Sequence, residues 1–209
     1  MKKNNPLLIG AILLFVIMVS AVCYAYYLNI PKARLPYFGE DSEESVSHII
    51  PAFSLTDQRG LTITADSIKG KIVVADFFFT TCRSICPLMS TQMKRVYQQY
   101  INDTSVCFVS HTVDPEFDTP QVLANYAKGK NAEVGKWYFL TGDKKQLYEL
   151  ARNGYYVSAT KGDGGPDDFV HTQNFALVDK TMHIRGYYDG TDSTAINKLI
   201  GDIKILQEE

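Results

Sequence analysis

The stretch IVVADFFFTTCRSICP, residues 72–87, decides how the rest of the sequence is interpreted. Residues 72–79 form a near-continuous apolar run, which is typical of a strand buried on both faces of a sheet. After Pro87, apolar side chains recur at three- and four-residue spacing to about Tyr100 and predict a helix. Cys82 therefore follows a buried strand, and Cys86 opens the helix after it.

The spacing of the two cysteines suits shared chemistry. If the turn between them is helical, four residues place Cys82 and Cys86 on one face. A helix N-terminus also lowers the pKa of a thiol. Two neighbouring thiolates are soft ligands that suit Cu(I), accept zinc, or form a disulfide. The alternative is that both cysteines are buried as small apolar residues and have no chemical role.

Strands and helices alternate through the rest of the chain. A turn at 57–60 between apolar segments predicts a hairpin, and Thr119-Pro120 predicts a helix start. Gly154 fits the position just after a helix. The predicted strands are 52–56, 61–64, 72–79, 106–109, 137–140, 175–178 and 183–188, and the helices are 87–100, 119–128, 144–153 and 193–207. This order predicts a thioredoxin-like α/β fold, a mixed sheet flanked by helices with an N-terminal β-hairpin.

The N-terminus contains an uncharged, mostly apolar run at residues 7–28, preceded by Lys2 and Lys3. At 1.5 Å per residue a helix of this length spans ~33 Å, enough for a bilayer core. We therefore predict a transmembrane helix after a short cytoplasmic segment, residues 1–6, with the rest of the chain in the periplasm or another extracytoplasmic space. A cleaved signal peptide and lipidation at Cys23 are the alternatives.

The remaining chain divides into a linker and one domain. Pro31, Pro36 and an acidic run at 40–44 predict a solvated linker at 29–47, followed by a domain at 48–209. The formal net charge of -2 gives no basic stripe for nucleic acid. Four cysteines are too few for a disulfide scaffold.

Two thiolates seldom complete a metal site, so the four histidines matter. His171 follows a glycine-rich loop and precedes the strand at Phe175, which in this fold neighbours the strand leading to Cys82. His171 could therefore approach the cysteine pair as a third ligand, giving a Cys₂His set that suits copper. His111, at the end of its strand, is a lesser candidate for a ligand or an outer-sphere residue. We expect His48 and His183 to be structural.

Other residues near the motif have weaker functional indications. Asp114, Glu116 and Asp118 form an acidic loop at the same sheet edge, interpreted as a solvated loop or a docking surface for a partner. Cys107 lies within an apolar strand and is expected to be buried. The three phenylalanines at 77–79 are expected to belong to the core.

Three segments together resemble the Sco (SenC-type) family: FFFTTCRSICP at 77–87, TVDPEFDTP at 112–120 and FVHTQNFALVDKTMHIRGYYDG at 169–190. The resemblance covers about residues 48–207. It implies that Cys82, Cys86 and His171 bind copper, as Cu(I) or Cu(II). It also implies a copper chaperone or thiol reductant that serves the dinuclear copper site of cytochrome c oxidase subunit II.

Two positions bear on how far the resemblance extends. Many family members carry aspartate before the distal histidine, where this chain has Val170, so Asp167 or Asp168 would have to supply that carboxylate. Asp76 lies six residues before Cys82, as in the thioredoxin pattern VDFxxxxC. It is predicted to be either a proton acceptor for a buried thiol or a hydrogen-bonded aspartate at the strand end.

Two functions therefore compete. The favoured one is a copper metallochaperone that binds through Cys82, Cys86 and His171. The other is a thiol–disulfide oxidoreductase with Cys82 as nucleophile, Cys86 as resolving thiol and Asp76 as proton acceptor. A peroxidase and a purely structural module fit the pattern less well. His171 discriminates between the two, because dithiol exchange does not need it.

Overall fold

The computed structural model describes residues 6–28, 33–39, 48–157 and 172–209. The chain forms two compact units, Met1–Ala33 and Arg34–Glu209. The first contains helix α1, Pro6–Leu28. Its segment Gly10–Tyr27 is long and apolar enough to cross a membrane by length and composition, and a signal sequence would meet the same criteria. A transmembrane role for α1 therefore stays a prediction.

The second unit is built on a seven-stranded mixed sheet with the order β2-β1-β5-β4-β3-β6-β7. β3, β4 and β5 run parallel, whereas the β1–β2 hairpin and the β6–β7 hairpin add antiparallel strands on either side. This arrangement confirms the predicted α/β fold. The strands are β1 Ser54–Asp57, β2 Thr62–Thr64, β3 Ile72–Phe78, β4 Val106–Thr112, β5 Trp137–Thr141, β6 Asn174–Val178 and β7 Ile184–Asp189.

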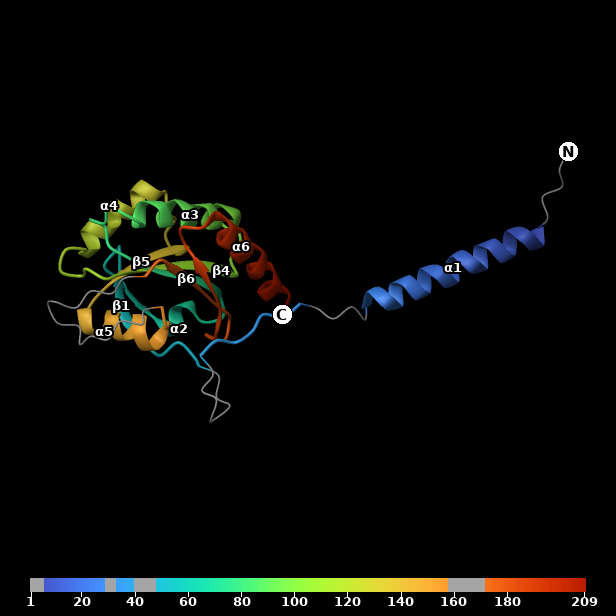
Figure 1. Ribbon diagram of the computed structural model, residues 1–209, viewed down its shortest axis with the longest axis horizontal. Coiled ribbons are helices and arrows are strands. Elements are labelled where there is room, and N and C mark those ends of the chain that lie inside the picture. Colours follow the sequence, from blue (N-terminus) through green and yellow to red (C-terminus); the bar gives the residue numbers. More distant parts are fainter. Residues whose placement is uncertain (1–5, 29–32, 40–47, 158–171) are drawn as a thin grey trace. The chain divides into compact units, whose positions relative to one another are not determined.

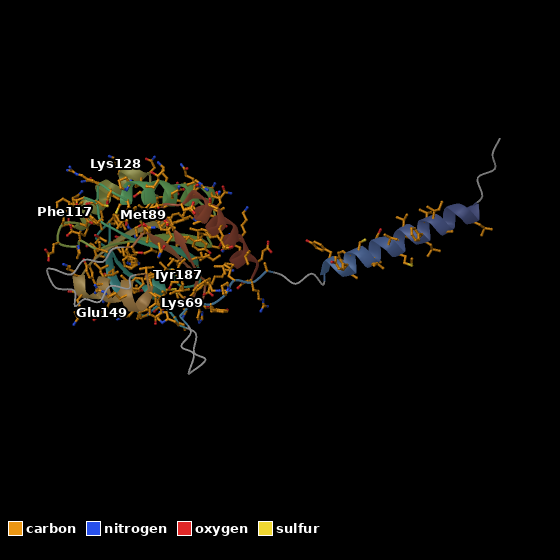
Figure 2. The ribbon with its side chains drawn as sticks, viewed as in Figure 1. Lys69, Met89, Phe117, Lys128, Glu149 and Tyr187 are labelled. Carbon is orange, nitrogen blue, oxygen red and sulfur yellow. The ribbon has the colours of Figure 1, made fainter. Side chains whose placement is uncertain are left out.

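Helices cover both faces of this sheet (Figure 1). α3 (Cys86–Gln99), α4 (Pro120–Lys130) and α6 (Ser193–Glu208) lie on one face, and α2 (Ala65–Ile68) and α5 (Lys144–Glu149) lie on the other. Each layer has its own apolar core, because the central strands are buried on both sides. Figure 2 shows Met89 of α3 inside one layer, while Lys128 and Glu149 lie at the surface.

A capping residue begins helix α4 as the sequence predicts. The Thr119 hydroxyl accepts a hydrogen bond from the Val122 amide at 3.4 Å, and Pro120 occupies the first turn of α4. Asn131 ends the same helix with a φ of 57°. Helix α3 begins at Cys86, so Pro87 again lies in a first turn, where a missing amide hydrogen is tolerated.

The predicted helix 144–153 with Gly154 just beyond its end is wrong in its second half. α5 ends at Glu149, and a π-helical turn, η1, covers Leu150–Gly154. Gly154 does not adopt a positive φ. A Cβ there would lie 2.7 Å from the end of the Leu150 side chain, so that side chain would have to shift to accept one. The four-residue helix α2 is a further difference, since the sequence predicts no helix there.

The compact unit starts at Arg34, earlier than the predicted domain start at His48. The cause is the buried side chain of Arg185 on β7. Its guanidinium donates hydrogen bonds to the carbonyl oxygens of Leu35 at 2.6 Å and Pro36 at 3.2 Å. The Phe38 amide adds a hydrogen bond to Ile184 at 2.9 Å. Part of the segment predicted as linker is therefore attached to the domain.

Candidate thiol and metal site

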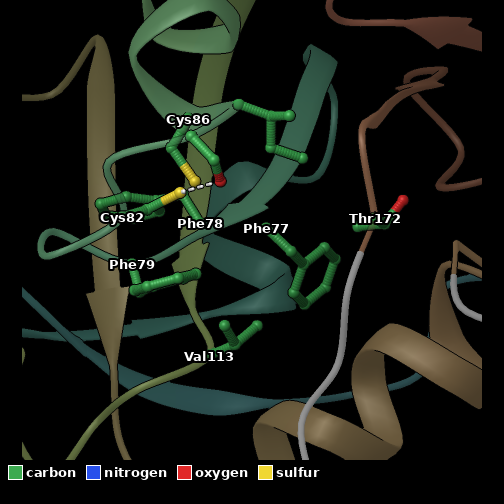
Figure 3. A pocket seen from close by; sticks show the side chains of 9 residues that line it. Phe77, Phe78, Phe79, Cys82, Cys86, Val113 and Thr172 are labelled. Atoms are coloured by element: carbon green, nitrogen blue, oxygen red, sulfur yellow. Dashed lines mark hydrogen bonds between the residues drawn. The ribbon is translucent and has the colours of Figure 1, made fainter.

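The two cysteines of the central motif lie at the carboxyl edge of the sheet. β3 ends at Phe78, a turn follows, and Cys86 is the first residue of α3. The Cys82 amide closes the turn by donating to the Phe79 carbonyl at 3.2 Å. A cavity of about 70 Å³ opens beside them, and Figure 3 shows both sulfur atoms together at its wall. The cavity is lined by Phe77, Phe78, Phe79, Cys82, Ser84, Ile85, Cys86, Val113 and Thr172.

The two thiols differ strongly in proton affinity. Burial opposes ionisation of Cys82, but hydrogen bonds with Cys86 and Ser84 outweigh it and lower the pKa of Cys82 to about 7. The Ser84 hydroxyl lies 3.6 Å from the Cys82 sulfur (Figure 3). Burial and the hydrogen bond to Cys82 raise the pKa of Cys86 to about 12. Near neutral pH the pair therefore holds one partly ionised, accessible thiol and one protonated, buried thiol.

Asp76 lies on the same face of β3 as the residues that contact α3. Its neighbours Val74 and Phe78 belong to the core layer that contains Cys86, and strand side chains alternate between faces. Burial raises the pKa of Asp76 to about 7. Its charge in turn helps to raise the pKa of Cys86, after burial and Cys82. The two groups are thus close enough to influence each other's protonation.

A chain of hydrogen bonds fixes the orientation of Asp76. The Trp137 indole N–H donates to the Ser110 hydroxyl at 2.9 Å. Ser110 in turn donates to Oδ1 of Asp76 at 2.5 Å. An indole nitrogen can only donate, so the Ser110 hydroxyl accepts from Trp137 and its single proton is free to point at the ionised Asp76 carboxylate. This hydrogen bond favours the charged form of Asp76 and partly offsets the effect of burial on its pKa.

The position of His171 lies outside the described residues, as do Val170, Asp167 and Asp168. Its neighbour Thr172 lines the same cavity as both cysteines (Figure 3). β6 pairs with β3 in antiparallel register, with Ala176 opposite Ala75, which confirms the predicted neighbourhood of these strands. Within the part of the chain that the structure describes, no group of three His, Cys, Asp or Glu side chains is arranged to hold a metal ion.

His111 does not join the thiols. It stacks on Phe77 with ring centroids 4.9 Å apart, in the core layer on the opposite side of the sheet from Cys86. It is fully buried, and burial lowers its pKa to about 3, so the ring is neutral. The prediction of His111 as an alternative ligand is wrong, because the alternation of β4 directs it into the other layer.

The other two histidines have structural contacts. Nε2 of His48 donates to the Gly154 carbonyl at 2.7 Å, so the Tyr156 hydroxyl donates to its Nδ1 at 3.1 Å. His183 precedes β7, where its Nδ1 lies 2.7 Å from the Thr181 hydroxyl. Cys107 is fully buried, as predicted, and burial raises its pKa to about 12.

The acidic loop differs from the prediction in one residue. Glu116 and Phe117 are exposed, and Figure 2 places Phe117 at the surface. Asp118 is instead completely buried and accepts hydrogen bonds from Thr80 and Thr112. It is therefore not part of a solvated acidic surface. The spacing of charges in the sequence carried no sign of this difference.

The unequal thiols lead to a first testable prediction. In the reduced protein we expect iodoacetamide to modify Cys82 at a rate that rises through about pH 7, following its thiolate fraction. Cys86 should stay unreactive to far higher pH. Peptide mapping by mass spectrometry measures both rates in one sample, with buried Cys107 as an internal control. Equal rates for Cys82 and Cys86 would contradict the assigned asymmetry.

Comparison with known proteins shows which family the chain belongs to. The SCO1/SenC family profile matches residues 41–206. The chain belongs to the SCO1/SenC family. The SCO1 protein homolog of Bacillus subtilis is 29% identical over 168 residues, which cover 79% of this chain and 86% of that protein. The resemblance expected from the Cys82–Pro87 motif is confirmed.

Two solved Sco structures extend the match. BsSco, described as a member of the Sco family of cytochrome c oxidase assembly proteins with a disulfide switch, is 29% identical with a TM-score of 0.66, covering 77% of this chain and 94% of that one. Copper-bound ScoI of Bradyrhizobium japonicum is 27% identical with a TM-score of 0.60, covering 76% and 99%. Each of these likenesses covers about three quarters of this Sco-family chain.

Proposed function

We propose that this chain binds copper through Cys82, Cys86 and His171 and acts as a chaperone for the dinuclear copper site of cytochrome c oxidase. The observation that carries the proposal is the shared cavity, which is lined by both thiols and by Thr172, the residue after His171. The copper-bound relative and the relative named for oxidase assembly support the same interpretation.

The donor atoms fit copper chemically. Two thiolates are soft ligands that favour Cu(I), and an added imidazole gives a set that accommodates either oxidation state. Cys82 needs little help to ionise near neutral pH, because hydrogen bonds from its neighbours offset its burial. Cys86 must lose a tightly held proton before it can bind, and the nearby Asp76 carboxylate is suited to receive it.

Helix α1 supplies the proposed membrane attachment. It would hold the domain at a membrane surface in the periplasm or an equivalent space, close to a membrane-bound oxidase. Subunit II of that oxidase, or a similar copper protein, is the proposed client. Ligand exchange between thiolates would then transfer the ion from Cys82 and Cys86 to the client site.

A thiol–disulfide reductase is the second candidate. The observation that favours it is the pairing of an accessible low-pKa thiol with a buried high-pKa thiol beside Asp76. Cys82 would attack a partner disulfide, and Cys86 would resolve the mixed disulfide after giving up its proton. The disulfide switch described for BsSco supports this chemistry.

The experiment that separates the two is copper retention by residues 34–209 in the reduced state, starting at Arg34 because residues 35–38 belong to the folded unit. Wild type should retain one copper per chain and show a thiolate charge-transfer band after Cu(II) addition. His171→Ala should lose both. His183→Ala is the matched control and should retain both, since its hydrogen bond is with Thr181 beside β7.

Each other outcome has a definite meaning. Unchanged copper binding in His171→Ala would remove His171 from the ligand set. Failure of the wild type to retain copper, together with a readily cycled Cys82–Cys86 disulfide, would assign the protein to the thiol oxidoreductases.

A further inference from the structure

Asp118 is a buried carboxylate with an unusual set of partners. Its side chain is completely enclosed. It accepts hydrogen bonds from the Thr80 amide at 3.1 Å, from the Thr80 hydroxyl, and from the Thr112 hydroxyl at 2.5 Å. Three donors compensate the cost of burying this group. The carboxylate thus joins two segments that are 38 residues apart in the sequence.

The end of β4 fixes Asp118 from one side. The Val113 amide donates to the Phe78 carbonyl at 2.8 Å and continues the β3–β4 ladder. The Thr112 hydroxyl accepts the Asp114 amide at 3.0 Å, so its only proton is left for Asp118. The Asp118 amide donates to the Asp114 carbonyl at 2.8 Å and closes the loop. Asp118 is therefore held rigidly against the sheet.

The other side of the carboxylate grips the turn that carries Cys82. This turn runs from Phe79 to Cys82, and Thr80 is its second residue. Asp118 holds Thr80 by both its main-chain amide and its hydroxyl. Cys86 lies outside this turn, at the first residue of α3. The position of Cys82 relative to Cys86 therefore depends on how the turn is held.

We propose that Asp118 is a positioning residue that sets Cys82 at the separation from Cys86 that the pair needs. The proposal rests on the proposed function, in that it takes the thiol pair as the working site, and it applies to both metal binding and disulfide formation. Releasing the turn lowers the effective concentration of one sulfur at the other, and displacements of about 1 Å at such sites cost up to about 100-fold in rate.

The test measures the equilibrium between the Cys82–Cys86 dithiol and glutathione disulfide in the full chain purified in detergent. One glutathione disulfide oxidises the pair, which gives one intramolecular disulfide and two molecules of reduced glutathione. The equilibrium constant is read by mass spectrometry after acid quenching. Thr80→Val, which keeps the shape of the side chain but removes the hydroxyl, should lower this constant about tenfold, and Asp118→Ala should lower it at least as far.

Two further variants separate positioning from general stability. Thr80→Ser keeps the hydroxyl and should match wild type. Thr112→Val removes one of the three donors to the carboxylate but leaves both Thr80 contacts in place, so it should lower the melting temperature and lower the constant clearly less than Thr80→Val does. If Thr112→Val lowers the constant as much as Thr80→Val, or if Thr80→Val leaves it unchanged, the proposal is overturned.

The glutathione equilibrium does not depend on bound copper. A wild-type protein that fails to retain copper would contradict the proposed function, while the glutathione equilibrium would still test Asp118. If circular dichroism shows that Asp118→Ala does not fold, the comparison of Thr80→Val with Thr80→Ser decides the result. If the wild type binds copper but Thr80→Val leaves the glutathione equilibrium unchanged, only the positioning role of Asp118 is contradicted.

Discussion

Replacing Asp76 with asparagine should change how the stability of the protein depends on pH. Burial raises the pKa of Asp76 from 3.8 to about 7 in the folded state. A raised carboxyl pKa means that the folded protein holds the proton more tightly than the unfolded chain does. The charged form therefore costs folding free energy, with no cost below pH 3.8, an increasing cost between pH 3.8 and 7, and a constant cost above pH 7.

The expected cost of the charged Asp76 side chain to folding is about 4 kcal/mol, the free energy that corresponds to this rise in pKa. Relative to wild type, Asp76→Asn should thus gain about 4 kcal/mol in unfolding free energy between pH 4 and pH 8. Urea denaturation across that pH range measures how the difference in stability between variant and wild type changes with pH. Any constant effect of the amide group cancels in this change.

A matched variant gives the opposite trend. Hydrogen bonds from Ser105 lower the pKa of Asp103, so Asp103→Asn should lose stability relative to wild type as the pH rises. If the difference between Asp76→Asn and wild type is flat with pH, Asp76 titrates near its ordinary value. In that case the residue would be less suited to receive the proton of Cys86.

Arg185→Met should have the largest effect on stability at constant pH. The Arg185 side chain is only 3% exposed and pairs with Asp179 at 3.0 Å and Glu209 at 2.7 Å. Methionine fills similar space but leaves a largely buried carboxylate without its cation, which costs about 3–5 kcal/mol. The carbonyl groups of Leu35 and Pro36 lose their donors in the same step.

Denaturant unfolding measures this loss, and limited proteolysis followed by N-terminal sequencing should reveal new cleavage near residues 35–38. The control is Lys198→Met, which removes an ion pair with Asp202 in which the lysine side chain is 66% exposed. The Asp202 side chain is only 10% exposed, but it keeps the Tyr188 hydroxyl as a hydrogen-bond donor at 2.6 Å, so this variant should lose much less stability than Arg185→Met. Equal losses of unfolding free energy in the two variants would show that the ion pairs of Arg185 stabilise the fold no more than that of Lys198.

The sequence predicted the sheet well because its signals are local. The apolar run at 72–79 and the alternation of strands and helices depend on neighbouring residues, and both hairpins lie next to recognisable turns. The cysteine pair was predicted for the same reason, since Cys82 and Cys86 are four residues apart. Helix caps such as Thr119 also act within a single turn.

The contacts that the sequence did not predict are distant along the chain. Arg185 meets Leu35 across 150 residues, and Asp118 meets Thr80 across 38. The different pKa values of Cys82 and Cys86 arise from unequal burial and from the hydrogen bonds that Cys82 makes with Ser84 and Cys86, which spacing does not encode. His111 was misplaced because β4 is buried on both faces, so its apolar pattern does not tell which face a given residue takes.

The hydrogen-bond chain through Ser110 gives the protein an optical probe of its own. Trp137 is the single tryptophan of the sequence, and its indole N–H is separated from Asp76 by one hydroxyl group. Indole emission responds to charge and hydrogen bonding at that nitrogen. Fluorescence excited at the red edge of the tryptophan band, where the tyrosines do not absorb, therefore monitors the charge state beneath the thiols without any label.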